Sequence, residues 1–152
     1  MKYIECPEVY EGQEMSLFLA GGISNCPIWQ PDLARLLKET NLVILNPKRK
    51  HFSTDNLNIE EEQINWEYNH LAKASAVSFW FPKETLCPIT LYELGKQSTG
   101  KKPLFIGVHA GYVRRRDVEI QTRLERPEIK IVYSLESLAE QIKDWARTNY
   151  LL

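Results

Sequence analysis

The sequence predicts one α/β domain over residues 1–152, in which helices cover both faces of a five-stranded, mostly parallel sheet. Two observations predict this class. Apolar strand patterns alternate with helix patterns about five times along the chain, and 152 residues is the length of one ordinary domain. We expect right-handed crossovers and, with the predicted strands numbered along the chain, the order 2-1-3-4-5. This is the arrangement of a flavodoxin-like or Rossmann-like sandwich.

The first three elements form a βαβ unit. Residues 16–22, SLFLAGG, have the composition of a buried strand and end in a glycine pair, where the backbone can turn tightly or let a ligand approach. Residues 28–40 follow as a helix, with Pro31 suited to its first turn and leucines along one face. The second strand covers 41–47 and ends at Pro47.

The alternation continues through the rest of the chain. A polar loop, residues 48–56, leads to a helix over 58–74 whose early acids suit the positive end of the helix dipole. The third strand covers 76–82, and the next helix runs from Pro88 to about Ser98. The remaining elements are strands at 102–109 and 129–133 and helices at 116–125 and 135–150.

Composition limits the kinds of partner. The chain has 19 Lys plus Arg against 20 Asp plus Glu, so no general positive field would hold it on nucleic acid or an anionic membrane. No window approaches the roughly 20 apolar residues of a membrane helix, and the glutamate-rich N-terminus is unlike a signal peptide. We expect a soluble, cytoplasmic protein that binds a small ligand. The three cysteines, expected to be free thiols, are Cys6, Cys26 and Cys87.

Two unusual loops are expected to meet at one place. In the predicted order the switch point lies between the first and third strands, and ligands bind beyond the carboxyl ends of the strands there. AGGISN, residues 20–25, follows the first strand, and FPKETLCPITLYELG, residues 81–95, follows the third. AGGISN lacks the third glycine of a dinucleotide fingerprint and the lysine of a phosphate loop. No motif therefore supports a phosphate cradle.

Glu93 is the first candidate for chemistry. It falls in the second turn of a helix that begins at Pro88, and helical side chains lean toward the N-terminus, so its carboxylate would point to the crevice mouth. The helix dipole favours its ionised form, whereas nearby aromatic side chains would desolvate it. A partly desolvated, ionised carboxylate suits nucleophilic attack on an electron-poor carbon; the alternative is a solvated residue or a cap for a neighbouring element. The aromatic residues are Phe79, Trp80, Phe81 and Tyr92.

Glu67 is the second candidate, on the helix before the third strand. If the middle of this helix borders the crevice, Trp66 or Tyr68 can stack on a planar ligand. Glu67 or Asn69 would then bond to the edge of that ligand. The alternative is an acidic, solvated face shared with the glutamates at 60–62. Two carboxylates beside aromatic residues suggest glycosidic chemistry, in which one attacks the anomeric carbon and the other manages the proton of the leaving group.

Four short motifs lie at a particular spacing. They are FLAGG in the first strand, NP after the second, WE on the following helix, and ELG at residues 93–95. Together they resemble the nucleoside 2-deoxyribosyltransferases, in particular the short deoxyribosyltransferase-like branch, over about residues 17–95. The resemblance implies transfer of a 2-deoxyribosyl group between nucleobases with net retention, as in nucleoside salvage. The implied partners are 2′-deoxynucleosides and free nucleobases, and no cofactor is implied.

The resemblance also implies roles for individual residues. Glu93 would attack C1′ and hold the deoxyribosyl group, and Glu67, where the family usually has aspartate, would contact the base and help transfer its proton. Phe18 corresponds to an aromatic residue beside the nucleophile, without the hydroxyl of the tyrosine found in many members. The other residues expected to contact the substrate are Gly21, Gly22, Asn25, Trp66, Trp80, Pro88 and Thr90.

Departures from the family pattern concern the sugar and the assembly. The family commonly has an aspartate in the loop before ELG, but this sequence has only Glu84, at a different offset. The Asn-x-Met element that a neighbouring subunit contributes in better-known members is not found. The resemblance still implies a homo-oligomer with sites near subunit interfaces.

Two other functions stay open. One is an N-glycoside hydrolase of a nucleoside or nucleotide on the same scaffold. Hydrolysis of a nucleotide would need a phosphate site, for which the AGGISN loop and the basic residues 48–50 are candidates. A non-catalytic nucleotide-binding or partner-binding domain would bind without base exchange. Its interaction patch would be the arginines at 114–116, unless they are solvated or pair with Asp117 and Glu119. No metal triad or Ser-His-Asp order is expected from the scattered histidines, His51, His70 and His109.

Overall fold

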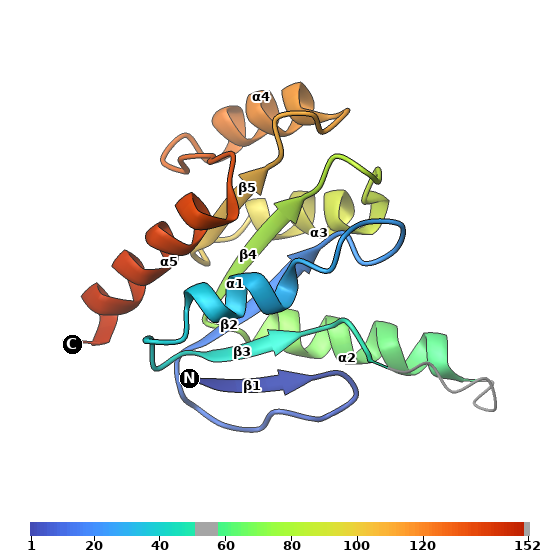
Figure 1. Ribbon diagram of the computed structural model, residues 1–152, viewed down its shortest axis with the longest axis vertical. Helices are drawn as coiled ribbons and strands as arrows, with labels where there is room; N and C mark the ends of the chain where they lie inside the picture. Colours follow the sequence, from blue (N-terminus) through green and yellow to red (C-terminus); the bar gives the residue numbers. More distant parts are fainter. Residues whose placement is uncertain (51–57, 151–152) are drawn as a thin grey trace.

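A five-stranded parallel sheet forms the centre of the protein (Figure 1). The computed structural model describes residues 1–50 and 58–150. The strand order is β1-β3-β2-β4-β5, and every neighbouring pair is parallel. The strands are β1 Lys2–Glu5, β2 Ser16–Gly21, β3 Val43–Asn46, β4 Ala76–Phe81 and β5 Leu104–Val108. The predicted α/β class with a mostly parallel sheet is confirmed.

The two edge strands of the sheet differ from those that the sequence predicts. β1 has no counterpart among the predicted strands, because only one of its four residues is buried and its pattern is weak; it pairs with β3. The predicted strand at 129–133 reaches β5 through an isolated bridge between Gly107 and Val132. The other four predicted strands keep their expected relative order, so the switch point stays between β2 and β4.

The helices are α1 Gln30–Leu36, α2 Ile59–Lys73, α3 Pro88–Ser98, α4 Arg115–Glu125 and α5 Leu135–Tyr150. α2 to α5 begin and end within about a residue of their predicted limits. α1 is shorter than predicted because the chain leaves the helix at Leu37, where the N–H of Thr40 bonds to the Leu37 carbonyl at 2.9 Å. The predicted loop at 48–56 lies partly outside the described residues.

The two faces of the sheet are covered by different helices. α2, α3 and α4 pack on one face, against alternate strand residues such as Phe18 and Phe79. α1 and α5 pack on the other, against Leu17 and Trp80. Because successive strand residues point to opposite faces, the aromatic run of β4 is divided between the two cores. In Figure 1 the strands share one direction, and the loops after β2 and β4 lie near each other at their carboxyl ends.

Hydrogen bonds connect the N-terminal segment after β1 to α2. The Trp66 indole N–H donates to the Glu8 carbonyl at 2.7 Å. The Tyr10 backbone N–H donates to Nε2 of His70 at 3.0 Å, so the proton of that imidazole lies on Nδ1, which donates to the Trp66 carbonyl at 2.7 Å. These bonds hold the Trp66 side chain on the N-terminal segment.

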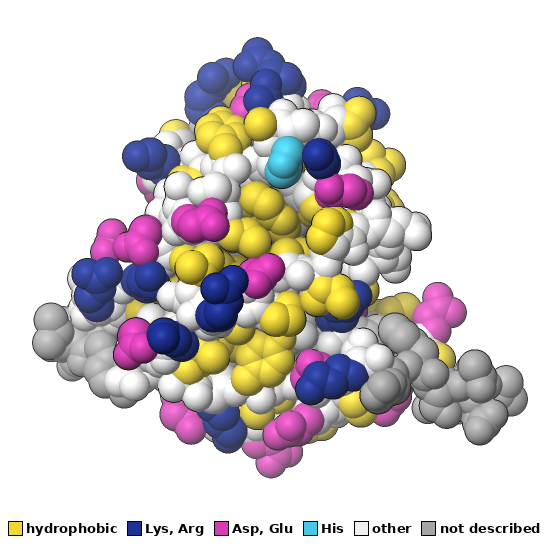
Figure 2. Space-filling view, in the orientation of Figure 1, with side chains coloured by type: hydrophobic (Ala, Val, Ile, Leu, Met, Phe, Trp, Pro, Cys, Tyr) yellow, Lys and Arg dark blue, Asp and Glu magenta, His cyan; other side chains and the backbone are white. Residues whose placement is uncertain are grey.

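The surface carries mixed charge. Figure 2 shows acidic and basic side chains interspersed over one face, with basic side chains gathered at the top over α4. The arginines 114–116 pair with nearby acids: Arg114 with Asp117 at 3.4 Å, and Arg115 and Arg116 with Glu119 at 3.6 Å. The ion-pairing that the sequence suggested for this run is therefore present. Among the described helices, none has the length and apolar character to cross a membrane.

Candidate active site

A crevice of about 360 Å³ lies at the switch point of the sheet. It opens beyond the carboxyl ends of β2, β3 and β4, and the first turns of α3 and the middle of α2 close its sides. Its lining comprises Ala20, Gly21, Gly22, Ile23, Ser24, Pro47, Gln63, Glu67, Thr85, Cys87, Pro88, Ile89, Thr90 and Glu93. The loops after β2 and β4 thus meet in one cavity, in the place that ligands occupy in this class of sheet.

The glycine pair lies at the end of β2, where other side chains pack closely against its backbone. A Cβ on Gly21 would meet the indole of Trp29 and the carbonyl of Trp80, and one on Gly22 would meet Pro82. The Trp29 indole N–H also donates to the Gly22 carbonyl at 2.8 Å. Both glycines are therefore required by packing, and this packing leaves their backbone at the crevice wall.

The loop between β4 and α3 aims the start of α3 into the crevice. Cys87 adopts a left-handed conformation with φ 52°, and Pro88 follows as the first helical residue. The Tyr112 hydroxyl donates to the Leu86 carbonyl at 2.7 Å, and its ring packs on Phe81 with centroids 5.1 Å apart. A left-handed non-glycine residue persists only where its surroundings hold it. The positive end of the α3 dipole consequently borders the crevice.

Glu93 projects into the crevice from the second turn of α3 and is half-buried. Desolvation raises the pKa of Glu93 to about 8, the charge of Glu67 adds to this rise, and Lys96 opposes it. Desolvation, one of the two influences expected from the sequence, is the largest cause of this rise. The protonated form of Glu93 is therefore favoured in the free protein.

Glu67 enters the crevice from α2 and is also half-buried. Burial raises its pKa as well, but a hydrogen bond from Gln63 and the charge of Arg49 act in the opposite direction. The Gln63 amide nitrogen donates to Oε1 of Glu67 at 2.6 Å. Glu67 and Glu93 thus line one cavity, and a negative charge on Glu67 is better supported than one on Glu93.

The structure brings several predicted site residues together and leaves others outside. Gly21, Gly22, Pro88 and Thr90 line the crevice with the two acids. The residues outside its lining are Phe18, Asn25, Trp66 and Trp80.

The physical reason differs for each of the four residues outside. Phe18 is fully buried in the core and packs on Trp66, with centroids 6.2 Å apart. Trp66 lies on the sheet side of α2, because adjacent helical residues such as Trp66 and Glu67 point in different directions. Its ring stacks on His70, with ring centroids 3.9 Å apart. Trp80 faces the core of α1 and α5, and Asn25 is exposed with φ 57°.

The expected aromatic wall around Glu93 is not present in the described lining. Phe79 and Phe81 are fully buried beneath it, and Tyr92 is 72% exposed on the outer side of α3. Tyr68 is also exposed, with the Lys96 ammonium 4.4 Å from its ring centroid. The described part of the crevice lining therefore contains no aromatic side chain.

Gln63 is a site residue that the sequence analysis missed. It lines the crevice and hydrogen-bonds Glu67, four residues further along α2. The spacing i, i+4 places two side chains on the same helix face, and this was the available signal.

The basic residues after β3 are engaged by the protein itself. The Lys48 ammonium donates to the Ile23 carbonyl at 3.1 Å. Arg49 is almost fully buried and pairs with Glu62 at 2.9 Å. Within residues 1–50 and 58–150, no cluster of three or more His, Cys, Asp or Glu side chains is placed to hold a metal ion; His51 falls outside this range. The three cysteines are free thiols.

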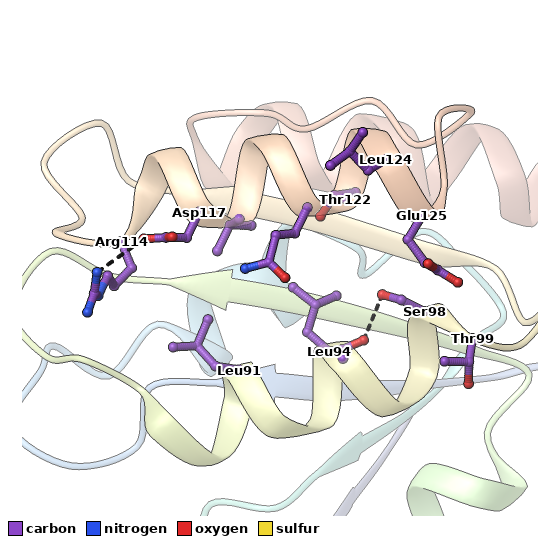
Figure 3. A pocket seen from close by; sticks show the side chains of 12 residues that line it. Leu91, Leu94, Ser98, Thr99, Arg114, Asp117, Thr122, Leu124 and Glu125 are labelled. Carbon is purple, nitrogen blue, oxygen red and sulfur yellow. Dashed lines mark hydrogen bonds and ion pairs between the residues drawn. The ribbon is translucent and has the colours of Figure 1, made fainter.

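A larger groove, of about 660 Å³, lies between α3 and α4 (Figure 3). Its floor contains Leu91, Leu94 and Val118, and its charged residues, among them Asp117 and Glu125, are exposed. Exposed charges keep their hydration and gain little reactivity from their surroundings. The smaller crevice, with its two desolvated acids, is the better candidate for catalysis.

Comparison with known proteins shows the family of the chain. The family described as "Nucleoside 2-deoxyribosyltransferase like" matches residues 14–112, which include β2 to β5, α1 to α3 and the whole crevice. The chain matches no curated protein sequence. The family match covers well over half of the 152 residues. The chain therefore belongs to the nucleoside 2-deoxyribosyltransferase-like family.

Proposed function

We propose that the protein transfers the 2-deoxyribosyl group between nucleobases through a covalent deoxyribosyl–Glu93 intermediate, with net retention. The observation that carries the proposal is the pair of half-buried acids, Glu67 on α2 and Glu93 on α3, that line one crevice at the switch point. Membership of the deoxyribosyltransferase-like family supports nucleosides as substrates.

The reaction uses the acid pair with one proton. Transfer of that proton to the base of a bound nucleoside leaves Glu93 ionised, and a carboxylate oxygen of Glu93 then attacks C1′. The C1′–N bond breaks, its electron pair stays on the nitrogen, and the base leaves neutral. In the second half a free base attacks C1′, the C1′–O bond breaks, and the proton released by the new base returns to the pair. Two displacements at one carbon give net retention.

The surroundings of Glu93 suit this chemistry. The transition state at C1′ is oxocarbenium-like, so a carboxylate beside the ring stabilises its positive charge. The same desolvation that raises the pKa of Glu93 makes the ionised carboxylate more reactive once its proton has left. Gly21, Gly22, Pro88 and Thr90 would border the nucleoside, since they line the same crevice. The role of Glu67 would be to hold the base and to relay its proton.

Assembly into a homo-oligomer is part of the proposal. Large apolar side chains are exposed beside the crevice on α2 and α3, and each is more than half exposed: Ile64, Tyr68, Ile89 and Tyr92. Contact of such a surface with a second copy would shield the crevice from water, which competes with the incoming base for the sugar ester.

The test is base exchange. The protein is incubated with 2′-deoxyinosine and adenine, and hypoxanthine and 2′-deoxyadenosine are followed by chromatography; thymidine serves as a second donor. New deoxynucleoside that is absent with Glu93→Ala would support transfer and the role of Glu93. Base released without new nucleoside would indicate an N-glycoside hydrolase instead. Nucleoside binding without either product would reject catalysis and leave a binding domain.

A further inference from the structure

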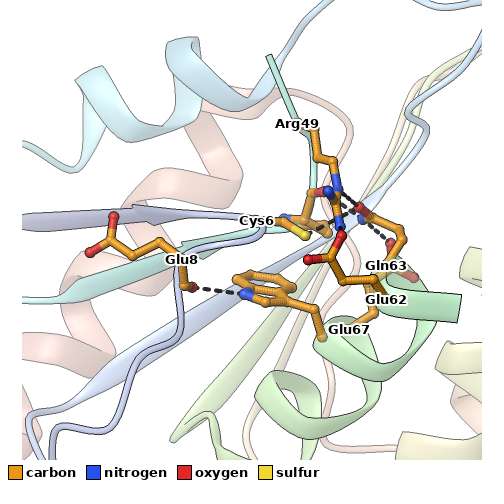
Figure 4. Close-up of polar contacts among 8 residues, drawn as sticks. Cys6, Glu8, Arg49, Glu62, Gln63 and Glu67 are labelled. Atoms are coloured by element: carbon orange, nitrogen blue, oxygen red, sulfur yellow. Dashed lines mark hydrogen bonds and ion pairs between the residues drawn. The ribbon is translucent and has the colours of Figure 1, made fainter. Parts of the chain in front are cut away.

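A chain of polar contacts leads from a buried arginine to the crevice (Figure 4). The Arg49 side chain is only 6% exposed. Its Nε donates to Oε1 of Gln63 at 2.6 Å, and its Nη2 donates to Oε2 of Glu62 at 2.9 Å. The Cys6 thiol also donates to Oε1 of Gln63, at 3.2 Å. The carbonyl oxygen of Gln63 is therefore held by two donors.

The amide nitrogen of Gln63 is held just as firmly. It donates to the Pro47 carbonyl at 2.7 Å and to Oε1 of Glu67 at 2.6 Å. Arginine can only donate and a backbone carbonyl can only accept, so these two partners determine which end of the amide is oxygen and which is nitrogen. Both N–H groups are used within the protein. Gln63 consequently lines the crevice but has no N–H left for a ligand.

We propose that Gln63 is a positioning residue: held by Arg49 and Pro47, it binds one carboxylate oxygen of Glu67 and leaves the other oxygen for the nucleobase. The inference rests on the proposed function. A carboxylate that accepts one fixed hydrogen bond has a fixed plane, so its second oxygen points in one direction. Glu67 would thereby reach the edge of a base reproducibly, although glutamate is longer than the aspartate implied by the resemblance.

The same contacts favour the ionised form of Glu67. The charged and titratable groups around Glu67 are Arg49 from the loop after β3, Glu62 on its own helix, Cys6 from the N-terminal segment and Glu93 from α3. Gln63 and Arg49 lower the pKa of Glu67 against the rise caused by burial. With that support Glu67 holds the negative charge of the pair, and the proton stays on Glu93.

The test replaces the amide of Gln63 and follows the titration of Glu67. Gln63→Met keeps the length of the side chain and removes both hydrogen-bonding groups. Gln63→Glu keeps an acceptor for Arg49, which secures the buried guanidinium, but cannot donate to Glu67 when ionised. The control is Gln141→Met, the same change at a glutamine that donates to the Lys130 carbonyl, on the opposite sheet face. Carboxyl carbons are observed by NMR in protein labelled with ¹³C-glutamate, and Glu67→Gln assigns the resonance.

We expect the titration midpoint of Glu67 to move to higher pH in both Gln63 variants, and further in Gln63→Glu, where a like charge is added. In base exchange the acidic limb of the pH–rate profile should move the same way, and kcat/KM should fall by about 100-fold, the lower end of a general acid's contribution. Gln141→Met should change neither.

The outcomes separate this inference from the proposed function. A Glu67 midpoint that stays in place in both folded Gln63 variants would overturn the inference, whatever the activity. A raised midpoint in a protein whose wild type exchanges no base would keep the link between Gln63 and Glu67 and reject the transferase function. A raised midpoint with an unchanged pH–rate profile would show that the hydrogen bond from Gln63 to Glu67 has no part in the reaction, and would also overturn the inference.

Discussion

Helix α3 has a cavity on each side, and the two differ in what they do to a charge. On the side of α2 is the crevice, about 360 Å³, where Glu93 and Glu67 are half-buried. On the side of α4 is the groove, about 660 Å³, where Asp117 and Glu125 are exposed. The groove has the larger volume, but the crevice is the cavity that raises the pKa of its two acids. Desolvation of ionisable groups, rather than size, therefore distinguishes the candidate active site.

The largest effect should come from exchanging one acid in each cavity. Glu93→Gln removes the nucleophile while keeping the shape of the side chain, so base exchange should fall by at least about 10³-fold. Glu125→Gln, the matched change in the groove, should leave the rate unchanged. The measurement is formation of 2′-deoxyadenosine from 2′-deoxyinosine and adenine. Equal loss in both variants, or in neither, would remove the distinction between the cavities.

The pH profile should show that the two acids of the crevice act as a pair. Because the proposed reaction requires one proton on the pair of carboxyl groups, a plot of kcat/KM against pH should be bell-shaped. It should fall as that proton is lost near pH 8. Glu67→Gln removes a negative charge that raises the pKa of Glu93. The remaining carboxyl should then titrate below 8, and activity should rise with pH through that lower midpoint.

We also expect a loss of rate of a particular size in Glu67→Gln. Because Glu67 can no longer relay the proton to the base, the rate at the optimum should drop by about 10²- to 10⁴-fold. An unchanged alkaline limb in Glu67→Gln would show that the two carboxyl groups do not share a proton.

Two glycines offer a comparison of stability between the crevice and the groove. Gly21→Ala places a methyl group against Trp29 and the carbonyl of Trp80, so unfolding free energy should fall by about 1–3 kcal/mol. Gly95→Ala lies in α3 on the groove side, where nothing approaches within 4 Å of the added carbon. Helix propensity should raise stability there by about 1 kcal/mol. Chemical denaturation measures both; a destabilised Gly95→Ala would mean that the groove is closed in solution.

The smallest expected effect is a change in the pH dependence of stability when Glu93 is replaced. The pKa of Glu93 is raised to about 8 in the folded protein from an ordinary value of 4.5. The folded state therefore binds the proton more tightly, and the resulting stabilisation is present below pH 4.5 and is lost as pH rises toward about 8. Glu93→Gln does not ionise, so at pH 9 it should exceed the wild type in stability by about 1 kcal/mol after allowance for solvent screening.

The comparison for this last prediction is again the groove. Glu125→Gln should show no such gain between pH 5 and pH 9, because Glu125 is exposed. Thermal unfolding at the two pH values provides the measurement. A wild type and a Glu93→Gln variant that respond identically to pH would indicate that Glu93 titrates as an ordinary solvated acid.

The local pattern of the chain was enough to predict most of the fold. Apolar runs such as 76–82 and the helix start at Pro88 are signals contained in a few neighbouring residues, and the alternation of strands and helices limits the sheet to few topologies. Two elements differ from the prediction. β1 is a short edge strand with one buried residue, and 129–133 has a strand's composition but meets β5 at one bridge. Their pairing depends on partners distant in sequence.

The sequence by itself determined that Glu93 and the two unusual loops would meet at the end of the sheet, because parallel strands bring their carboxyl ends to one edge. Only the tertiary structure decided what surrounds the acids. The side of β4 that carries Trp80, the face of α2 that carries Trp66, and the link from Arg49 through Gln63 to Glu67 depend on how the layers pack. Burial and hydrogen bonding between distant segments set protonation, so no local pattern contains it.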